Sequence, residues 1–553
     1  MASRSISEQV IDCLGKNKSF IVEAGAGSGK THTLIEALSH LLARRSDDYL
    51  SFGQQIVCIT YTNVAVNEIM SRINSDPLVH VSTIHDFLWS VIRDHQKELR
   101  QCILEANKRN EGSKHIDNLN LAGISIEYWQ YGSRWQEGKI HHDDVISLAS
   151  IMFFSYPKLS RLVADKYPVI FIDEYQDTQE TVVDLLFDVL KNSSKGSLTL
   201  GFFGDYMQKI YGTGIGKLDR PELISIQKLE NYRCSTEVIR VLNKLRPELQ
   251  QVAASNNTPR GSAQFFYTRD ENIGIETLRK RLRNEGWKSS EKILMLTRKS
   301  IAKSLGWEDL RSLYTSKNRF ALDDLLRGDD AFSDTFQAIE NSVTAFDNRR
   351  YGDLYTILSV RRQKDHELFS NPSEYKIYIS QVIGELKELC RSATIGQVLD
   401  HIWNKSLIPK SNRIIGLEDK AQSNEDIYTF ISNLREIPYP QVSALYRYLN
   451  DKTPFSTKHG TKGEEYDDVI VVINDRSWNK YNFASVLENN VDKKQYERSL
   501  NLFYVCCSRA RNNLAVLMES EANNDTIAGA RRIFGDEHVI ELSRDKGCDG
   551  IQD

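Results

Sequence analysis

The sequence predicts an α/β protein built from two parallel-sheet cores, each of which carries a mainly helical insertion. Short apolar runs alternate with amphipathic helical segments over residues 19–203, and the same alternation returns in the second half of the chain. Strands that alternate with helices form parallel sheets covered on both faces. At about 100–200 residues per domain, a chain of 553 residues has room for both cores and their insertions.

Four apolar runs are the expected strands of the first core. They comprise residues 19–24, 55–60, 168–172 and 198–203. The first run, SFIVEA, leads into a glycine-rich turn and then into a helix with Leu34, Leu38 and Leu41 on one face. The third run, PVIFI, is followed directly by Asp173. Strand, turn and amphipathic helix in this order are typical of the start of a doubly covered parallel sheet.

The second core is expected to be interrupted as well. Its expected strands are ILML (293–296), DDVIVVI (467–473) and NLAVLM (513–518), and the charge-rich residues between the first two have a helical pattern. We therefore predict a first core over 1–87 and 166–240 with an insertion at 88–165, and a second core over 241–304 and 451–553 with a mainly helical insertion at 305–450.

Composition excludes several classes of protein. Hydrophobic residues make up 40% and charged residues 26% of the chain, which excludes collagen-like and disordered proteins. The net charge of −4 excludes a histone-like protein, but not a nucleic-acid binder whose basic residues gather in one groove. The eight cysteines form no Cys-x-x-Cys pair, and signal-peptide and membrane-spanning patterns are absent. We therefore expect reduced thiols and a cytoplasmic protein.

The glycine-rich turn has the pattern of a phosphate-binding loop. It consists of Ala24, Gly25, Ala26, Gly27, Ser28, Gly29, Lys30 and Thr31. Ala24 stands where the strict pattern has glycine. The three glycines let backbone N–H groups converge on phosphate oxygens at a helix N-terminus. Lys30 would reach the β- and γ-phosphates, and the Thr31 hydroxyl would bind Mg²⁺. The alternative is a glycine-rich turn without a ligand.

The segment FIDEYQD supplies the other groups that a nucleoside triphosphatase needs. Asp173 lies at the carboxyl end of a buried run and would hold Mg²⁺, while Glu174 would orient and deprotonate the attacking water. Alone, two acidic residues after a strand usually begin a solvated loop. Together with the phosphate loop they predict ATP hydrolysis.

Eight motifs then occur in the order found in one helicase family. They are AGAGSGKT, ITYTNVAVNEIMSRI, STIHDF, FIDEYQDT, GDYMQKIYG, LENYR, STKHGTKGEEYDDV and YVCCSRA. In these motifs, between Gln9 and Ala510, the chain resembles the UvrD/Rep-like superfamily 1A DNA helicases. The resemblance implies two RecA-like P-loop cores, with ATP and Mg²⁺ as cofactors and ATP bound between the cores.

The resemblance also implies roles for residues around ATP. Gln9 would read the adenine edge, Tyr232 would stack on the base, and Glu465 would hold the ribose hydroxyl. His32 occupies the position of the family's stacking arginine. Gln208 would sense the γ-phosphate. Two arginine fingers would close from the second core and neutralise transition-state charge, namely Arg233 and Arg509.

Further residues would contact single-stranded or partly duplex DNA by the same resemblance. They are Tyr61, Thr62, Asn63, His85, Tyr211, Arg298, Thr457 and His459. Tyr211 offers an aromatic face for a base, and Arg298 a cation for a phosphate. Each of them is as easily explained by a structural role, and their joint occurrence at motif positions favours DNA. Cycles of ATP binding and hydrolysis would then move the strand, 3′ to 5′ in the family.

The chain departs from the family in ways that imply a protein partner. Gly212, Thr213 and Gly214 replace the usual aromatic residue and arginine after Tyr211. The insertions are shorter than in the large family members, and the segment after Ala510 is too short for a nuclease domain. In size and layout the chain resembles the compact helicase subunit of Gabija-type antiphage systems, which implies a nuclease or another DNA-processing subunit as partner.

Three functions stay open at the level of sequence. The first is an ATP-driven DNA translocase or helicase. The second is a DNA-gated ATPase that acts as a sensor or regulator with little unwinding of its own, and it uses the same motifs. The third is a small-molecule P-loop kinase, which leaves the motifs LENYR and YVCCSRA unexplained.

Overall fold

The computed structural model describes residues 5–109, 115–129, 132–209, 213–270, 273–288, 290–295, 297–318, 320–358, 372–450, 454–457, 464–476 and 479–543. The chain divides into two compact units. The first unit comprises Met1–Glu285, Lys462–Val471 and Asn479–Asp553, and the second comprises Gly286–Thr461 and Val472–Trp478. The division into cores and insertions that the sequence suggests stays a prediction.

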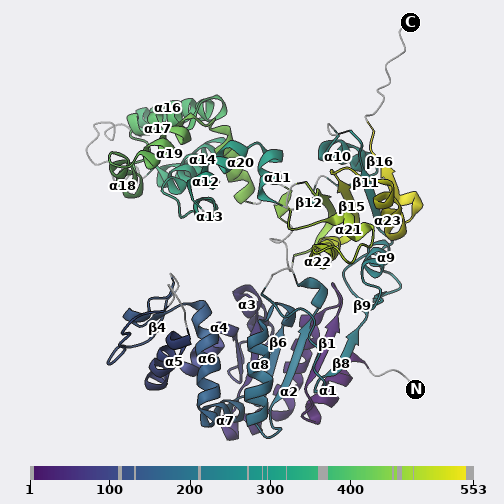
Figure 1. The fold of residues 1–553 in the computed structure, drawn as a ribbon. Coiled ribbons are helices and arrows are strands. Elements are labelled where there is room, and N and C mark those ends of the chain that lie inside the picture. The colour runs from purple at the N-terminus through teal and green to yellow at the C-terminus, as the bar shows by residue number, and fades with distance from the viewer. Residues whose placement is uncertain are drawn as a thin grey trace. The chain divides into compact units, whose positions relative to one another are not determined.

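The first sheet has six parallel strands in the order β3-β2-β6-β7-β1-β8 (Figure 1). The strands are β1 (Phe20–Ala24), β2 (Ile56–Thr60), β3 (Val79–Thr83), β6 (Val169–Asp173), β7 (Thr199–Gly204) and β8 (Ile224–Lys228). The four strands expected from the sequence are β1, β2, β6 and β7, with ends within one residue of those expected. The outermost strands, β3 and β8, were not expected.

Helices cover both faces of the first sheet. Val22 and Phe171 belong to a buried cluster with residues of α1–α3, whereas Ile21 and Ile170 belong to a second cluster with residues of α4–α6 and α8. Successive strand residues thus face opposite helical layers. The elements are α1 (Ile6–Gly15), α2 (Lys30–Phe52), α3 (Asn63–Arg72), α4 (Ile84–Ile92), α5 (Gln96–Arg109), β4 (Glu127–Tyr128), η2 (Trp135–Glu137), β5 (Lys139–Ile140), α6 (His142–Ser155), α7 (Pro157–Lys166), η3 (Tyr175–Asp177), α8 (Glu180–Asp184), η4 (Leu185–Lys191) and η5 (Tyr206–Gln208).

The second sheet also has six strands, in the order β13-β12-β14-β15-β11-β16. β11 pairs with β15 and β16, and β12 with β13, in parallel. The bounds are β11 (Ser262–Tyr267), β12 (Lys292–Met295), β13 (Phe455–Thr457), β14 (Tyr466–Ile473), β15 (Ala510–Met518) and β16 (Val539–Glu541). Also present are β9 (Glu230–Asn231), β10 (Val252–Ala253), α9 (Thr236–Leu245), α10 (Ile275–Asn284), α21 (Phe483–Leu487), α22 (Tyr496–Cys507), α23 (Asn524–Phe534) and η8 (Asp536–His538). Two such sheets confirm the predicted α/β class.

The second unit is rich in helices (Figure 1). They are α11 (Arg298–Leu305), α12 (Glu308–Lys317), α13 (Ala321–Arg327), α14 (Ser333–Asp347), α15 (Tyr351–Ile357), α16 (Pro372–Ser392), α17 (Ile395–Asn404), α18 (Asn412–Ala421), α19 (Glu425–Glu436) and α20 (Pro440–Leu449). One buried cluster around Trp307 and Tyr314 holds them together. Among the described helices of the chain, none is long and apolar enough to cross a membrane.

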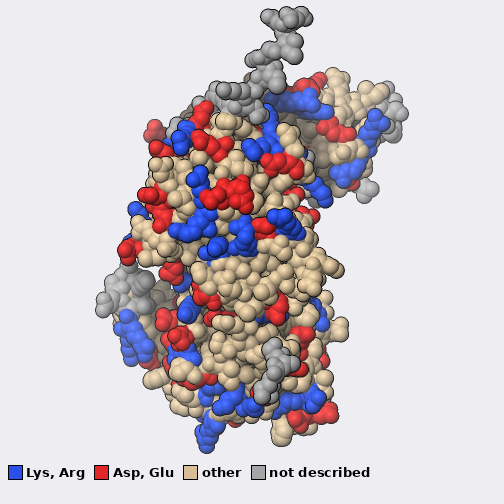
Figure 2. All heavy atoms as spheres, turned by 90° about the vertical axis from the view of Figure 1, so that its right-hand side faces the viewer, with Lys and Arg blue, Asp and Glu red and all other residues tan. Residues whose placement is uncertain are grey.

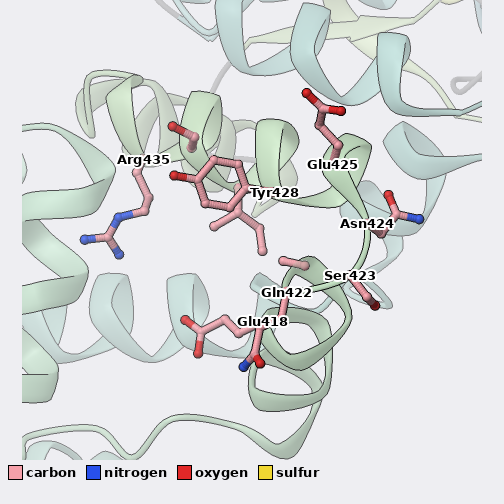
Figure 3. Close-up of a pocket in the computed structure, with 10 residues that line it drawn as sticks. Glu418, Gln422, Ser423, Asn424, Glu425, Tyr428 and Arg435 are labelled. Atoms are coloured by element: carbon pink, nitrogen blue, oxygen red, sulfur yellow. The ribbon is translucent and has the colours of Figure 1, made fainter.

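An open groove of about 910 Å³ lies between α18 and α19 (Figure 3). Two charged residues of its lining are already paired, because Lys410 Nζ donates to Glu418 (2.8 Å) and Arg435 Nη2 to Asp400 (2.6 Å). Tyr428 lines it with a side chain that is 64% exposed. Surface charge is mixed elsewhere too, as Figure 2 shows for one face, in keeping with 71 basic and 75 acidic residues.

Candidate nucleotide-binding site

The predicted catalytic residues of the first core gather at one edge of the first sheet. Because its strands are parallel, Ala24, Asp173 and Gly204 end β1, β6 and β7 at the same edge. Lys228 ends β8 opposite Ala24. Open α/β sheets bind their ligands outside the carboxyl ends of the strands, and this edge is therefore the candidate site.

The loop between β1 and α2 is held by residues far along the chain. Gly27 and Gly29 have φ of 75° and 74°, a backbone conformation that glycine adopts without strain. The carbonyl of Ala26 accepts hydrogen bonds from Asn231 Nδ2 (2.9 Å) and Gln251 Nε2 (3.0 Å). The buried residues of this loop include Ala24, Gly25, Ala26 and Ser28. The loop geometry is thus fixed by packing as well as by its glycines.

Replacing Gly27 by alanine is expected to weaken ATP binding about tenfold or more. A Cβ there would lie 2.7 Å from Arg233 Cβ and 2.8 Å from Asn231 Oδ1, and the positive φ adds roughly 1–2 kcal/mol of strain. The matched control is Gly53→Ala, where φ is 61° but nothing lies within 4 Å of the added Cβ. Titration calorimetry with ATP should separate the two variants, and equal affinities would contradict the prediction.

The polar side chains of the loop suit a phosphate and a hard cation. Ser28 Oγ is buried and has no hydrogen-bond partner among the described residues. Lys30 and Thr31 begin α2 and are half-buried. An oxygen-only donor set of the Thr31 hydroxyl and the Asp173 carboxylate is the kind that Mg²⁺ prefers. These residues therefore fit a triphosphate with its magnesium ion.

The two adjacent carboxylates differ in their surroundings. Asp173 is 6% exposed, and burial together with the neighbouring Glu174 charge raises its pKa, which Lys30 lowers in part. Glu174 has a left-handed backbone with φ of 48°. Strained non-glycine residues of this kind cluster at functional sites. Burial of Asp173 beside a second anion favours a cation at this point.

Gln176 connects Glu174 to the end of β7. Its Nε2 donates to Glu174 Oε2 (2.6 Å), and its Oε1 accepts from the Asp205 N–H (3.0 Å). Gly204 makes this bridge possible, since a Cβ there would lie 2.4 Å from Gln176 Oε1. Gln208 Nε2 donates to Asp205 Oδ2 (2.9 Å). The expected base and the expected γ-phosphate sensor thus share one hydrogen-bond network.

Asp205 of this network also belongs to a buried ion pair that the sequence did not reveal. Arg246 Nη1 and Asp205 Oδ1 are 2.7 Å apart, and their side chains are 1% and 0% exposed. The Arg246 guanidinium lies 4.8 Å from the centre of the Tyr206 ring. Although burial acts to lower it, the charges of Asp205 and Tyr504 raise the pKa of Arg246. Tyr504 also accepts the Ala26 N–H at 3.1 Å.

Arg233 lies next to the loop and forms an ion pair with Glu465. Its Nε is 2.5 Å from Glu465 Oε2, and Glu465 also pairs with Arg511. Burial acts to raise the pKa of Glu465, but the two arginines hold it below its usual value. The structure thus brings together two predicted site residues, the arginine finger and the ribose-binding glutamate, as partners of each other.

Arg509 follows α22 and is 1% exposed. Its side chain donates to three groups of its own surroundings, the carbonyls of Glu464 (3.0 Å) and Val505 (3.1 Å) and the hydroxyl of Ser508 (3.2 Å). Burial and the nearby Arg233 charge lower the pKa of Arg509 to about 10. A buried cation beside a half-buried one favours an anion close to both.

The residues expected around the base lie on α1, at the start of α2 and beside the phosphate loop. The Tyr232 N–H donates to the Gly27 carbonyl at 2.9 Å, and the Tyr232 ring is 68% exposed. His32 is exposed, with Nδ1 3.5 Å from Glu36 Oε2. Gln9 is half-buried on α1. α1 and α2 are linked at this point, because Ser7 Oγ donates to Glu36 Oε2 (2.6 Å).

The DNA-contact candidates of the first unit lie at the carboxyl ends of β2 and β3. Tyr61, Thr62 and Asn63 follow β2 and are exposed, and the Thr62 hydroxyl caps α3 by accepting the Ala65 N–H at 3.2 Å. His85 instead stacks on His142, with ring centres 3.3 Å apart. Burial and the His142 charge lower the pKa of His85 to about 4. His85 is thus a packed group of α4.

Acidification is expected to destabilise the protein through His85. Its pKa of about 4 in the folded chain lies below its ordinary value of 6.5, so the unfolded chain takes up a proton between these values while the folded chain does not. Stability is therefore lost as the pH falls from 7 towards 4, by about 1–2 kcal/mol at pH 5 for this group. Urea denaturation should show a shallower loss between pH 7 and pH 5 for His85→Gln than for the wild type, and parallel curves would contradict the assignment.

The remaining DNA-contact candidates belong to the second unit or lie outside the described residues. Arg298 begins α11, and its Nη1 is 2.5 Å from Asp323 Oδ1. Thr457 is the last residue of β13. Tyr211 and His459 lie outside the part of the chain that the structure describes.

The fold and this edge define a class of protein, the P-loop nucleotide-binding proteins with two α/β cores. Comparison with known sequences narrows the class. The UvrD/REP helicase N-terminal domain matches residues 5–131 and 105–213. Residues 5–213 are thus similar to the N-terminal domain of UvrD/REP helicases.

Individual proteins are similar to this chain as well. Gabija protein GajB of Bacillus cereus (strain HuB5-5) is 25% identical over an alignment of 669 positions, and the alignment covers 95% of this chain and 96% of that protein. ATP-dependent DNA helicase Rep of Buchnera aphidicola subsp. Baizongia pistaciae (strain Bp) is 28% identical over 278 residues, 41% of this chain and 40% of that one. The solved structure of the Pif1 helicase from Candida albicans aligns over 57% of this chain and 55% of its own at 15% identity, with a TM-score of 0.26, which is too low to support a structural argument.

Proposed function

We propose that this protein is an ATP-dependent DNA translocase or helicase that hydrolyses ATP at the edge formed by β1, β6 and β7. One observation carries the proposal. A phosphate loop, two acidic residues at the end of β6 and two buried or half-buried arginines, Arg233 and Arg509, meet in one unit of the fold. This combination supplies phosphate binding, metal binding and charge neutralisation together.

Each group has a chemical role in the proposed reaction. Lys30 and the loop N–H groups bind the triphosphate, while Thr31 and Asp173 would hold Mg²⁺, which polarises the phosphoryl oxygens when bound. Glu174 accepts the proton of the attacking water, and Gln176 fixes the orientation of its carboxylate. Arg233 and Arg509 neutralise the charge that develops on the phosphoryl group. Gln9, Tyr232 and Glu465 contact the nucleoside.

We further propose that the chain binds single-stranded DNA and acts together with a protein partner. Tyr61, Thr62 and Asn63 are exposed next to the first sheet and would contact single-stranded DNA, with movement 3′ to 5′. Similarity to a Gabija protein over 95% of the chain supports a role in antiviral defence. Within that role we propose that the chain acts with a nuclease or another DNA-processing subunit.

The test measures ATP turnover and strand displacement with the full chain. Turnover stimulated by single-stranded DNA, together with displacement of a duplex that carries a 3′ overhang, is expected. Stimulated turnover without displacement, both alone and with proteins that co-purify from the native host, would support the DNA-gated ATPase instead. Turnover that DNA does not change would contradict both.

A further inference from the structure

A lysine that the proposed reaction does not use lies beside the phosphate loop. Lys228 ends β8 and is 7% exposed. Its Nζ donates to Thr33 Oγ1 (2.6 Å) in the first turn of α2 and to the carbonyl of Gly29 (3.3 Å), which directly precedes α2. A buried ammonium needs such partners because its desolvation is costly. Lys228 therefore ties the last position of an edge strand to the loop itself.

The same ammonium lies against an aromatic ring. Lys228 Nζ is 5.7 Å from the centre of the Tyr232 ring, within the range of a cation–π interaction. A Cβ added to Gly29 would lie 3.8 Å from Lys228 Nζ, 3.8 Å from His32 Cβ and 4.0 Å from Tyr232 Cδ2. Lysine, ring and loop thus form one cluster.

The Tyr232 side chain is largely exposed to solvent. It is 68% exposed, and its backbone is anchored to the loop by the hydrogen bond to the Gly27 carbonyl. An exposed ring loses side-chain freedom when a ligand stacks on it, which lowers affinity. A cation held at one side of the ring restricts it beforehand, and also draws electron density from it, which favours stacking on an electron-rich base.

We propose that Lys228 is a positioning residue that holds the Tyr232 ring beside the phosphate loop and thereby strengthens binding of the purine base, not of the phosphates. The inference rests on the proposed nucleotide site. It assigns base recognition to a side chain outside the loop and its motif. Lys228 changes the affinity for ATP only by positioning the Tyr232 ring.

The test is calorimetric binding of ATP and of inorganic tripolyphosphate to the full chain. Lys228→Met is expected to weaken ATP binding about 5- to 20-fold and to change tripolyphosphate binding by less than about twofold. The loop should survive, because the Thr33 hydroxyl can donate to the Gly29 carbonyl in place of the lysine. The matched control is Lys139→Met, which removes a cation 4.7 Å from the Trp129 ring and should change neither affinity.

A double-mutant cycle with Tyr232→Leu completes the test. In the Tyr232→Leu background, Lys228→Met should have no further effect on ATP binding. Equal weakening of ATP and tripolyphosphate, an unchanged affinity for ATP, or a full effect of Lys228→Met without the ring would each overturn the proposal. A wild type that binds neither ligand would instead refute the proposed nucleotide site.

Discussion

Replacing Glu174 by glutamine is expected to lower DNA-stimulated ATP turnover by about 100- to 10,000-fold, the usual contribution of a general base. Glutamine keeps the shape of the side chain and an oxygen that can accept the hydrogen bond from Gln176 Nε2, which is 2.6 Å long. It cannot take a proton from water. The variant should therefore bind ATP and unfold at the wild-type temperature while turnover is lost.

The control for this variant is Glu180→Gln. Glu180 is an exposed residue in the first turn of α8, six positions further along the chain, so the same chemical change there should leave turnover intact. Steady-state ATP hydrolysis with and without single-stranded DNA compares the two. Wild-type turnover of Glu174→Gln would show that another group accepts the proton, and loss of folding would be visible in the thermal unfolding curve.

The inner strands of the first sheet could be predicted because both their faces are covered. β2 and β6 are buried at every position, and their sequences are apolar up to the last residue, which is Thr60 in β2 and Asp173 in β6. β3 and β8 lie at the two edges of the sheet and are partly exposed, with burial on only some positions. Edge strands carry polar residues for this reason, and their period is too weak to mark them in the sequence.

The site shows the same contrast between local and distant information. The phosphate loop and Asp173 are short continuous segments whose chemistry can be interpreted directly. Arg246 and Lys228 belong to no such motif, and Tyr504, which does, contacts Ala26 across 478 positions of the chain. Only folding brings such residues together. The sequence holds a weak signal for two of these residues. Tyr504 lies within YVCCSRA, and Arg246 is a charged residue directly after the apolar run of α9.

The buried ion pair beneath the site leads to the largest expected effect on stability. Replacing Arg246 by methionine should lower the free energy of unfolding by about 3–5 kcal/mol, because it leaves the Asp205 carboxylate buried without its cation. Asp205 is 0% exposed. It would keep only hydrogen bonds, including those from the Met207 N–H (3.1 Å) and Gln208 Nε2 (2.9 Å). ATP turnover should fall as well, since Asp205 positions Gln208.

Two further variants separate the lost charge pair from lost packing. The double variant Arg246→Met with Asp205→Asn removes the unpaired charge and keeps an oxygen acceptor for Gln208, so it should recover a large part of the lost stability. The control is Arg72→Met, which breaks the ion pair between Arg72 and Glu68. Their side chains are 46% and 49% exposed, so the free energy of unfolding should fall by less than about 1 kcal/mol. Urea denaturation at pH 7 measures all three. If Asp205→Asn gave no recovery, the cost of Arg246→Met would come from the cavity and from the lost cation–π contact with the Tyr206 ring (4.8 Å). The ion pair would then not be what stabilises this part of the fold.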